Sequence, residues 1–82
     1  MKEEITAFIS ITTEHTTPEI IKGQLLKVAK IEWLYFVTGD YDYIMKVSCK
    51  DMDELKTAVV DIRKIKGVKI SNTSIILRKL TD

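Results

Sequence analysis

The sequence of 82 residues predicts an α+β fold in which four strands form one antiparallel sheet and two helices cover one face of that sheet. The first observation is the order of hydrophobic periods, because segments with period two and segments with period 3.6 follow one another as βαββαβ. The second is length, since a chain of this size allows one hydrophobic core and no second domain. The third is composition: 45% of the residues are hydrophobic, which is ample for a core. Residues 1–82 are therefore expected to form a single domain.

The first strand is predicted at residues 5–12. Apolar and polar side chains alternate there, and one face collects Ile5, Ala7, Ile9 and Ile11. A helix follows, for which Thr17 is suited to cap the first N–H groups and Pro18 to occupy the first position. Its apolar stripe consists of Ile21, Leu25 and Val28. Gly23 within this helix costs about 1 kcal/mol relative to alanine, which predicts the close approach of a neighbouring segment.

A second strand is predicted at residues 31–38, and both of its faces are apolar. The two faces are Ile31, Trp33, Tyr35 and Val37 on one side and Leu34 and Phe36 on the other. Both faces should therefore be buried. Two helices can cover only one face of the sheet, so the other face is expected to meet the sheet of a second copy. The sequence thus predicts a dimer that forms through its sheets.

Residues 39–42 predict a tight turn, because glycine and aspartate tolerate the backbone conformations that a hairpin needs. A third strand is expected at residues 43–50. Its apolar face consists of Tyr43, Met45, Val47 and Cys49.

A second helix begins at Asp51, which has the spacing of a capping box with Glu54. Its apolar positions are Leu55, Ala58, Val59, Ile62 and Ile65. The helix is expected to run to Lys66, where Gly67 ends it, and a last strand is predicted at residues 68–77. Two split βαβ units with right-handed crossovers then give a ferredoxin-like sandwich.

Charge and composition exclude several classes of protein. The chain has 13 Lys and Arg against 12 Asp and Glu, a net charge of +1, which disfavours direct binding to nucleic acid. The longest uncharged apolar run, residues 33–37, is too short to cross a membrane, and the start of the chain has no signal peptide. The single cysteine cannot form a disulfide within the chain. A cytoplasmic protein is predicted.

Catalytic equipment is sparse. The sequence has no glycine-rich phosphate loop, no Cys-x-x-Cys and no paired histidines, so no cofactor, metal or catalytic residue is predicted. His15 could act as a general base, but a solvated loop histidine is favoured. Cys49 is expected to pack inertly in the core. Trp33 and Tyr35 could stack nucleobases, but the acidic neighbours favour packing in a core or interface.

The turn itself carries chemistry that turn geometry does not account for. Tyr41 and Tyr43 bracket the carboxylates, which makes the turn amphipathic. Asp40 and Asp42 offer a weak metal site, because no neutral ligands accompany them. Free N–H groups and carboxylates together could instead hold both ends of a zwitterion, the N–H groups binding a carboxylate and aspartate an ammonium.

The run Val37-Thr38-Gly39-Asp40-Tyr41-Asp42-Tyr43-Ile44-Met45-Lys46-Val47, followed by Asp51-Met52-Asp53-Glu54-Leu55, resembles the effector domain of the Lrp/AsnC (leucine-responsive, or feast/famine) transcription regulators. Gly67-Val68 and Ser71-Asn72-Thr73-Ser74-Ile75-Ile76-Leu77 are similar to the last strand of that domain. The likeness covers residues 5–77. It implies a RAM domain (regulation of amino-acid metabolism) that dimerises through its sheets and often assembles further into rings, commonly octamers.

The resemblance also implies where a ligand binds. Effector amino acids of the family lie between subunits, near the hairpin that matches residues 39–42. Gly39 and Tyr41 are then expected to give backbone N–H contacts, and Asp40 or Asp42 to hold the ligand ammonium. Ser71 and Thr73 match threonines of the family pattern and would supply hydroxyl groups. Because residues 71–73 are expected at the end of the sheet opposite the hairpin, they would join it only from another subunit.

Family members carry an N-terminal DNA-binding helix-turn-helix, whereas this chain begins at the first RAM strand. The start Met1-Lys2-Glu3 indicates a natural stand-alone domain in preference to a fragment. We therefore expect a non-enzymatic domain that binds a small amino-acid effector and modulates full-length Lrp/AsnC regulators. Two alternatives stay open: a ligand-free oligomerisation partner of such a regulator, and a small dimeric α+β enzyme acting through His15.

Overall fold

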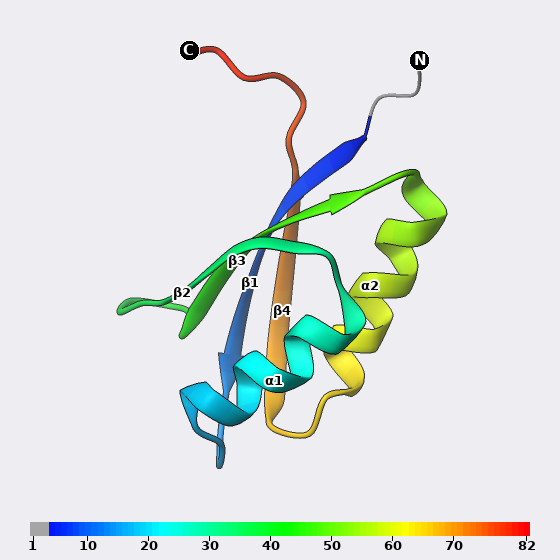
Figure 1. The fold of residues 1–82 in the computed structure, drawn as a ribbon. Helices are drawn as coiled ribbons and strands as arrows, with labels where there is room; N and C mark the ends of the chain where they lie inside the picture. Colours follow the sequence, from blue (N-terminus) through cyan, green and yellow to red (C-terminus); the bar gives the residue numbers. More distant parts are fainter. Residues whose placement is uncertain (1–3) are drawn as a thin grey trace.

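The computed structural model of the chain describes residues 4–82, so the start of the chain at residues 1–3 lies outside the described part. Figure 1 shows a sheet with both helices on one of its faces. The elements are β1 (Ile5–Thr13), α1 (Pro18–Val28), β2 (Ile31–Phe36), β3 (Tyr43–Cys49), α2 (Met52–Lys64) and β4 (Val68–Ile75). The predicted βαββαβ order and ferredoxin-like fold are confirmed. The strand order is β2-β3-β1-β4, and every neighbouring pair is antiparallel.

The core lies between the sheet and the two helices. The strands contribute Ala7, Ile9, Ile11, Tyr43, Met45, Val47 and Cys49, and the helices contribute Ile21, Leu25, Leu55 and Ile62. These are the apolar faces that the sequence periods predict. Their burial is the main favourable contribution to folding, at about 25 cal/mol per Å² of apolar surface removed from water.

Both helix starts are capped as predicted. The Oγ1 of Thr17 accepts the N–H of Ile20 at 3.3 Å, and the Oδ1 of Asp51 accepts the N–H of Glu54 at 2.8 Å. Glu54 reaches back through its Oε1 to the N–H of Lys50 at 3.3 Å. Helix α2 ends at Lys64, before the expected Lys66, because Ile65 already leaves the helical conformation with ψ of 130°.

The outer strands are shorter than predicted. Strand β2 ends at Phe36 instead of residue 38, and β4 ends at Ile75 instead of Leu77. The expected close neighbour of Gly23 is also wrong, since a Cβ placed there would meet nothing within 4 Å. Gly23 is exposed on α1, and no packing reason for it is found.

Strand β2 departs from simple alternation. Ile31 pairs with Val47, but Trp33 pairs with Lys46, so a bulge lies between Ile31 and Trp33. The predicted common face for Ile31 and Trp33 is therefore wrong. The extra residue turns Ile31 toward the helices, where it packs against the core with Leu34, and leaves Trp33 on the opposite face.

The face of the sheet away from the helices carries an aromatic cluster. We call Phe8, Trp33 and Tyr35 the outer aromatic cluster. The ring of Trp33 lies 5.6 Å from that of Phe8 and 5.0 Å from that of Tyr35, between centroids. Tyr35 is 57% exposed, and Ile70 on the same face is 56% exposed. An apolar surface of this kind on one side of a small domain is typical of a protein interface.

The register sets the position of the hairpin between β2 and β3. Ile11 pairs with Tyr43 on one side and with Ser71 on the other. Strands β3 and β4 are both antiparallel to β1, so both begin where β1 ends. The hairpin and the first half of β4 therefore lie at the same end of the sheet, and the expectation that residues 71–73 lie at the opposite end is wrong.

Candidate functional site

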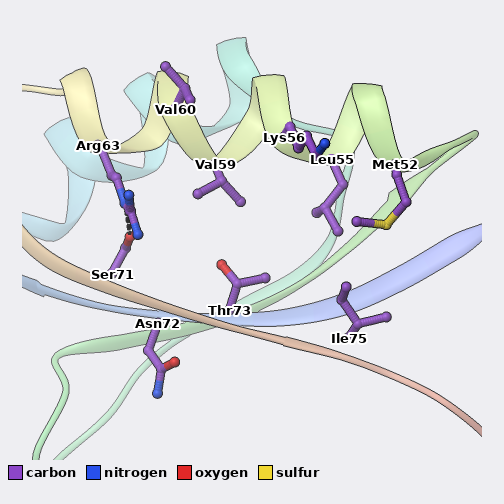
Figure 2. A pocket seen from close by; sticks show the side chains of 10 residues that line it. All are labelled: Met52, Leu55, Lys56, Val59, Val60, Arg63, Ser71, Asn72, Thr73 and Ile75. Atoms are coloured by element: carbon purple, nitrogen blue, oxygen red, sulfur yellow. Dashed lines mark hydrogen bonds between the residues drawn. The ribbon is translucent and has the colours of Figure 1, made fainter.

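A groove of about 580 Å³ runs between helix α2 and the edge strand β4, and Figure 2 shows its side chains. Helix α2 contributes Met52, Leu55, Lys56, Val59, Val60 and Arg63, and strand β4 contributes Ser71, Asn72, Thr73 and Ile75. Two periodicities place these residues. Helix positions spaced by three and four lie on one face, and alternate residues of a strand share one side.

Ser71, Thr73 and Ile75 face helix α2. Their partners across the sheet are Ile11, Ile9 and Ala7, whose side chains are fully buried on the helix side. The two residues predicted from this strand, Ser71 and Thr73, therefore both line the groove. The floor between them and α2 is apolar, and the hydroxyl groups lie on its strand side (Figure 2).

Arg63 is a polar residue of the groove that the sequence analysis missed. Its Nε donates a hydrogen bond to the Oγ of Ser71 at 3.0 Å, which holds the guanidinium over β4 (Figure 2). An arginine side chain has five N–H donors, so the remaining ones can bind a carboxylate. The sequence does contain a pattern that could have predicted Arg63. Spacings of four, three and four place Met52, Lys56, Val59 and Arg63 on one face of α2, beside the face that packs in the core.

Hydrogen bonds join the base of the hairpin to the end of β1. The N–H of Asp42 donates to the carbonyl of Ile11 at 2.9 Å, and the N–H of Val37 donates to the carbonyl of Asp42 at 2.8 Å. The Oδ2 of Asp42 accepts the N–H of Thr13 at 2.7 Å. The carboxylate of Asp42 thus stabilises the fold of its own chain.

The tip of the hairpin is free. Gly39 has φ of +117°, a conformation that favours glycine, and Asp40 is exposed. Within residues 4–82, the N–H groups of Gly39, Asp40 and Tyr41 donate no hydrogen bond. Three free N–H groups beside one free carboxylate match the pattern expected for binding both charges of an amino acid.

Tyr41 extends from the hairpin toward the last strand. Its hydroxyl accepts a hydrogen bond from the Nδ2 of Asn72 at 3.2 Å. Asn72, a partner that the sequence did not predict, lies beside the groove on β4, but its side chain points to the face of the sheet away from α2 (Figure 2). Even so, none of the groove's lining residues comes from residues 39–42, so the hairpin tip and the groove do not form one site within a single chain.

The other candidates take no part in the groove. His15 is exposed with φ of +56°, and Cys49 is buried and lies in the core as predicted. Burial, followed by the nearby charges of Glu54, Asp51 and Glu4, raises the pKa of the Cys49 thiol. Across residues 4–82, no three His, Cys, Asp or Glu side chains lie close enough together to hold a metal ion. No helix in the same range is long and apolar enough to span a membrane.

Comparison with known proteins places nearly the whole described chain in one family. The model of the family described as Lrp/AsnC ligand binding domain matches residues 6–82. The regulator LysM of Sulfurisphaera tokodaii, of helix-turn-helix type, is 34% identical over 80 residues, which are 95% of this chain and 56% of the regulator. A homocitrate synthase of Sulfolobus acidocaldarius is 35% identical over 81 residues, 95% of this chain but 17% of the synthase. The chain thus spans about half of the regulator and a small part of the synthase.

Solved structures agree with the fold. A protein of Thermus thermophilus has a TM-score of 0.83 and 28% identity, with 95% of this chain and 99% of that protein covered. A Neisseria meningitidis transcriptional regulator, solved with L-methionine, has a TM-score of 0.84 and 21% identity, with 95% of this chain and 53% of the regulator covered. At that identity the second likeness shows the fold alone.

Proposed function

Because the chain belongs to the Lrp/AsnC ligand-binding domain family, we propose that it is a regulatory domain that binds a small amino acid between subunits. One observation carries this proposal. The chain presents a hairpin tip with free N–H groups and a free carboxylate, and separately a groove with an arginine and two hydroxyl groups. The hairpin tip of one subunit would hold the two backbone charges of an amino acid, and the groove of a neighbouring subunit would hold its side chain.

The hairpin of one subunit would hold the backbone of the ligand. The N–H groups of Gly39 and Tyr41 would donate to the α-carboxylate, and Asp40 would accept from the ammonium. Asp42 is not assigned this role, since its Oδ2 already accepts the N–H of Thr13. Ser71 and Thr73 of a neighbouring subunit would face the rest of the ligand across the groove.

Assembly follows from the exposed faces of the fold. The outer aromatic cluster would meet the same surface of a second copy, which would bury Tyr35 and Ile70. Dimers would join further through the hairpins and grooves into a ring, such as an octamer. A ligand that contacts two subunits stabilises the assembled state over the separated one, so binding and assembly would be coupled.

This domain would act in the cytoplasm, on full-length Lrp/AsnC regulators with which it assembles, and without contacting DNA itself. The matched relatives support regulation: LysM is a transcriptional regulator, and only 17% of the homocitrate synthase matches, so that likeness gives no support for catalysis by this domain. The alternative of a ligand-free partner shares the assembly but leaves the hairpin tip without a use.

Native mass spectrometry tests the proposal. The purified protein is measured with and without a mixture of the proteinogenic amino acids. An even-numbered oligomer that gains about one amino-acid mass per subunit is expected. An oligomer that takes up nothing would favour the ligand-free partner, and a monomer at micromolar concentration would contradict both functions.

A further inference from the structure

The groove between α2 and β4 is positively charged. Its two charged lining residues, Lys56 and Arg63, are both basic, and none of its lining residues is acidic. They lie seven residues apart on α2, which is about two turns, so they project from the same face about 10 Å apart along the helix. Between them the groove is lined by the apolar Val59 of α2 and by Thr73 of β4, and Ile75 lies beyond Lys56, below Leu55 and Met52 (Figure 2).

Neither Lys56 nor Arg63 has a carboxylate partner among residues 4–82. The ion pairs found within residues 4–82 join Lys30 to Glu4, Lys46 to Glu32 and Lys69 to Glu14, and none involves Lys56 or Arg63. Arg63 is instead oriented by Ser71, a neutral partner that leaves its charge uncompensated. Two unpaired cations at one groove generate a field that attracts anions and repels cations.

From this arrangement we infer that the groove selects an amino acid with an acidic side chain, such as glutamate, aspartate or a longer amino diacid. This inference rests on the proposed function, because it assigns the side-chain end of the ligand whose backbone end the hairpin holds. The side-chain carboxylate would accept hydrogen bonds from Arg63 and lie within the reach of Lys56. The methylene groups of the ligand would contact the apolar lining, near Val59.

Charge complementarity decides between ligand classes here. A cationic ligand such as lysine would bring a third positive charge to Lys56 and Arg63, and like charges brought together disfavour binding. A neutral apolar ligand would fit the lining but would leave two cations facing it without partners. A side-chain carboxylate avoids the repulsion and also gives the cations a partner, because arginine binds a carboxylate through paired N–H donors.

The test compares glutamate with glutamine, which has nearly the same shape and no side-chain charge, and with lysine, each titrated into the assembled protein by calorimetry. Glutamate is expected to bind more tightly than either, by about tenfold or more. Lys56→Gln and Arg63→Gln should each reduce the ratio of glutamate to glutamine affinity by about three- to tenfold. Lys64→Gln is the matched control, since Lys64 carries the same charge on the same helix but does not line the groove. It should leave the ratio unchanged.

The outcomes separate this inference from the proposed function. If a neutral or basic amino acid binds at least as tightly as glutamate and aspartate, the acidic selectivity is overturned and amino-acid binding stands. If acidic ligands bind best but Lys56→Gln and Arg63→Gln behave like Lys64→Gln, the assignment to this groove is overturned. If no amino acid binds, both the inference and the proposed function fail.

Discussion

The carboxylate of Asp42 is bonded to Thr13, 29 residues earlier in the chain, through the backbone N–H at 2.7 Å and the side-chain hydroxyl at 3.3 Å. This relationship ties the hairpin between β2 and β3 to the end of β1. The two aspartates of the hairpin, which the sequence pattern does not distinguish, therefore have different roles. Asp42 stabilises the hairpin, and Asp40 remains exposed at its tip.

Asp42→Ala should lower the free energy of unfolding by about 1–3 kcal/mol, because it leaves the part-buried N–H of Thr13 without its charged acceptor. Chemical denaturation followed by circular dichroism measures this. Asp40→Ala is the matched control and should change stability by less than about 0.5 kcal/mol, since Asp40 is exposed and makes no hydrogen bond within residues 4–82. Equal losses for the two variants would contradict the division of roles.

Asp40→Ala should instead abolish amino-acid uptake. In the proposed site its carboxylate is the negative charge of the hairpin that accepts from the ligand ammonium, because the carboxylate of Asp42 is already bonded to Thr13. Native mass spectra of the variant should show the same oligomer as the wild type with no added amino-acid mass. Retained uptake by Asp40→Ala would remove the hairpin from the site, while loss of the oligomer itself would show that Asp40 contributes to assembly.

Most of the fold could be predicted from the sequence because its elements carry consistent local signals. The apolar faces of β1 and β3, the caps Thr17 and Asp51, and the apolar stripe of α2 are all found as predicted. The bulge in β2 was not predictable, since the alternation from Ile31 to Val37 looks regular in the sequence. The register shifts because Ile31 pairs with Val47 while Trp33 pairs with Lys46. Such pairing depends on the neighbouring strand, so the sequence of β2 alone does not show it.

The ligand-binding roles of the candidate residues stay predictions. Ser71 and Thr73 line the groove, and the N–H groups of Gly39 and Tyr41 donate no hydrogen bond within residues 4–82, so these four residues are placed where they could take the predicted roles. The two missed residues, Arg63 and Asn72, act through partners that only the folded chain supplies, namely Ser71 and Tyr41. The predicted separation of residues 71–73 from the hairpin was wrong. Strands β3 and β4 both run antiparallel to β1, which places the hairpin and the start of β4 at the same end of the sheet.

The outer aromatic cluster should determine dimerisation. Tyr35→Arg is expected to weaken the dimer about 30-fold or more, because a buried tyrosine at an interface centre contributes about 2 kcal/mol or more and the new charge would be desolvated. Tyr35 is 57% exposed in the single chain, so the variant should still fold. Sedimentation velocity over a range of concentrations measures the shift.

Leu26→Arg is the control for the dimer. Leu26 is also apolar and 52% exposed, but it lies on α1, on the other side of the sheet. Its replacement should leave the sedimentation of the dimer unchanged. The opposite pattern, with dissociation caused by Leu26→Arg and not by Tyr35→Arg, would move the interface from the sheet to the helices.

Stability should fall at alkaline pH. Burial raises the pKa of the Cys49 thiol above its ordinary value of 9.0, and burial with the charges of Asp42 and Glu19 raises the pKa of Tyr43 above 10.0. The folded state holds both protons more tightly than the unfolded chain does, so their contribution is complete below the unfolded pKa values and is lost as pH rises through the folded ones. Urea midpoints should therefore be level between about pH 7 and 8 and should decline above about pH 9.

Cys49→Ala should flatten the first part of that decline, between about pH 9 and 10, because it removes the thiol and leaves Tyr43. The same thiol should react slowly with a disulfide reagent in the folded protein at neutral pH, since it is buried and protonated. A decline that begins at the same pH in Cys49→Ala and wild type would assign it to other groups.

The glycines at 23 and 67 should respond in opposite directions to replacement by alanine. Gly23 lies within helix α1, and a Cβ there would meet nothing within 4 Å, so Gly23→Ala should raise the free energy of unfolding by about 0.5–1 kcal/mol through helix propensity. Gly67 has φ of +99°, and its Cβ would lie 3.1 Å from the carbonyl oxygen of Glu14. Gly67→Ala should therefore cost about 1–3 kcal/mol. Denaturation curves of the two variants measure both changes. A loss of stability in Gly23→Ala would contradict the expectation for Gly23. It would indicate that a neighbouring subunit packs against α1 at that residue, which would explain a glycine that the single chain leaves unexplained.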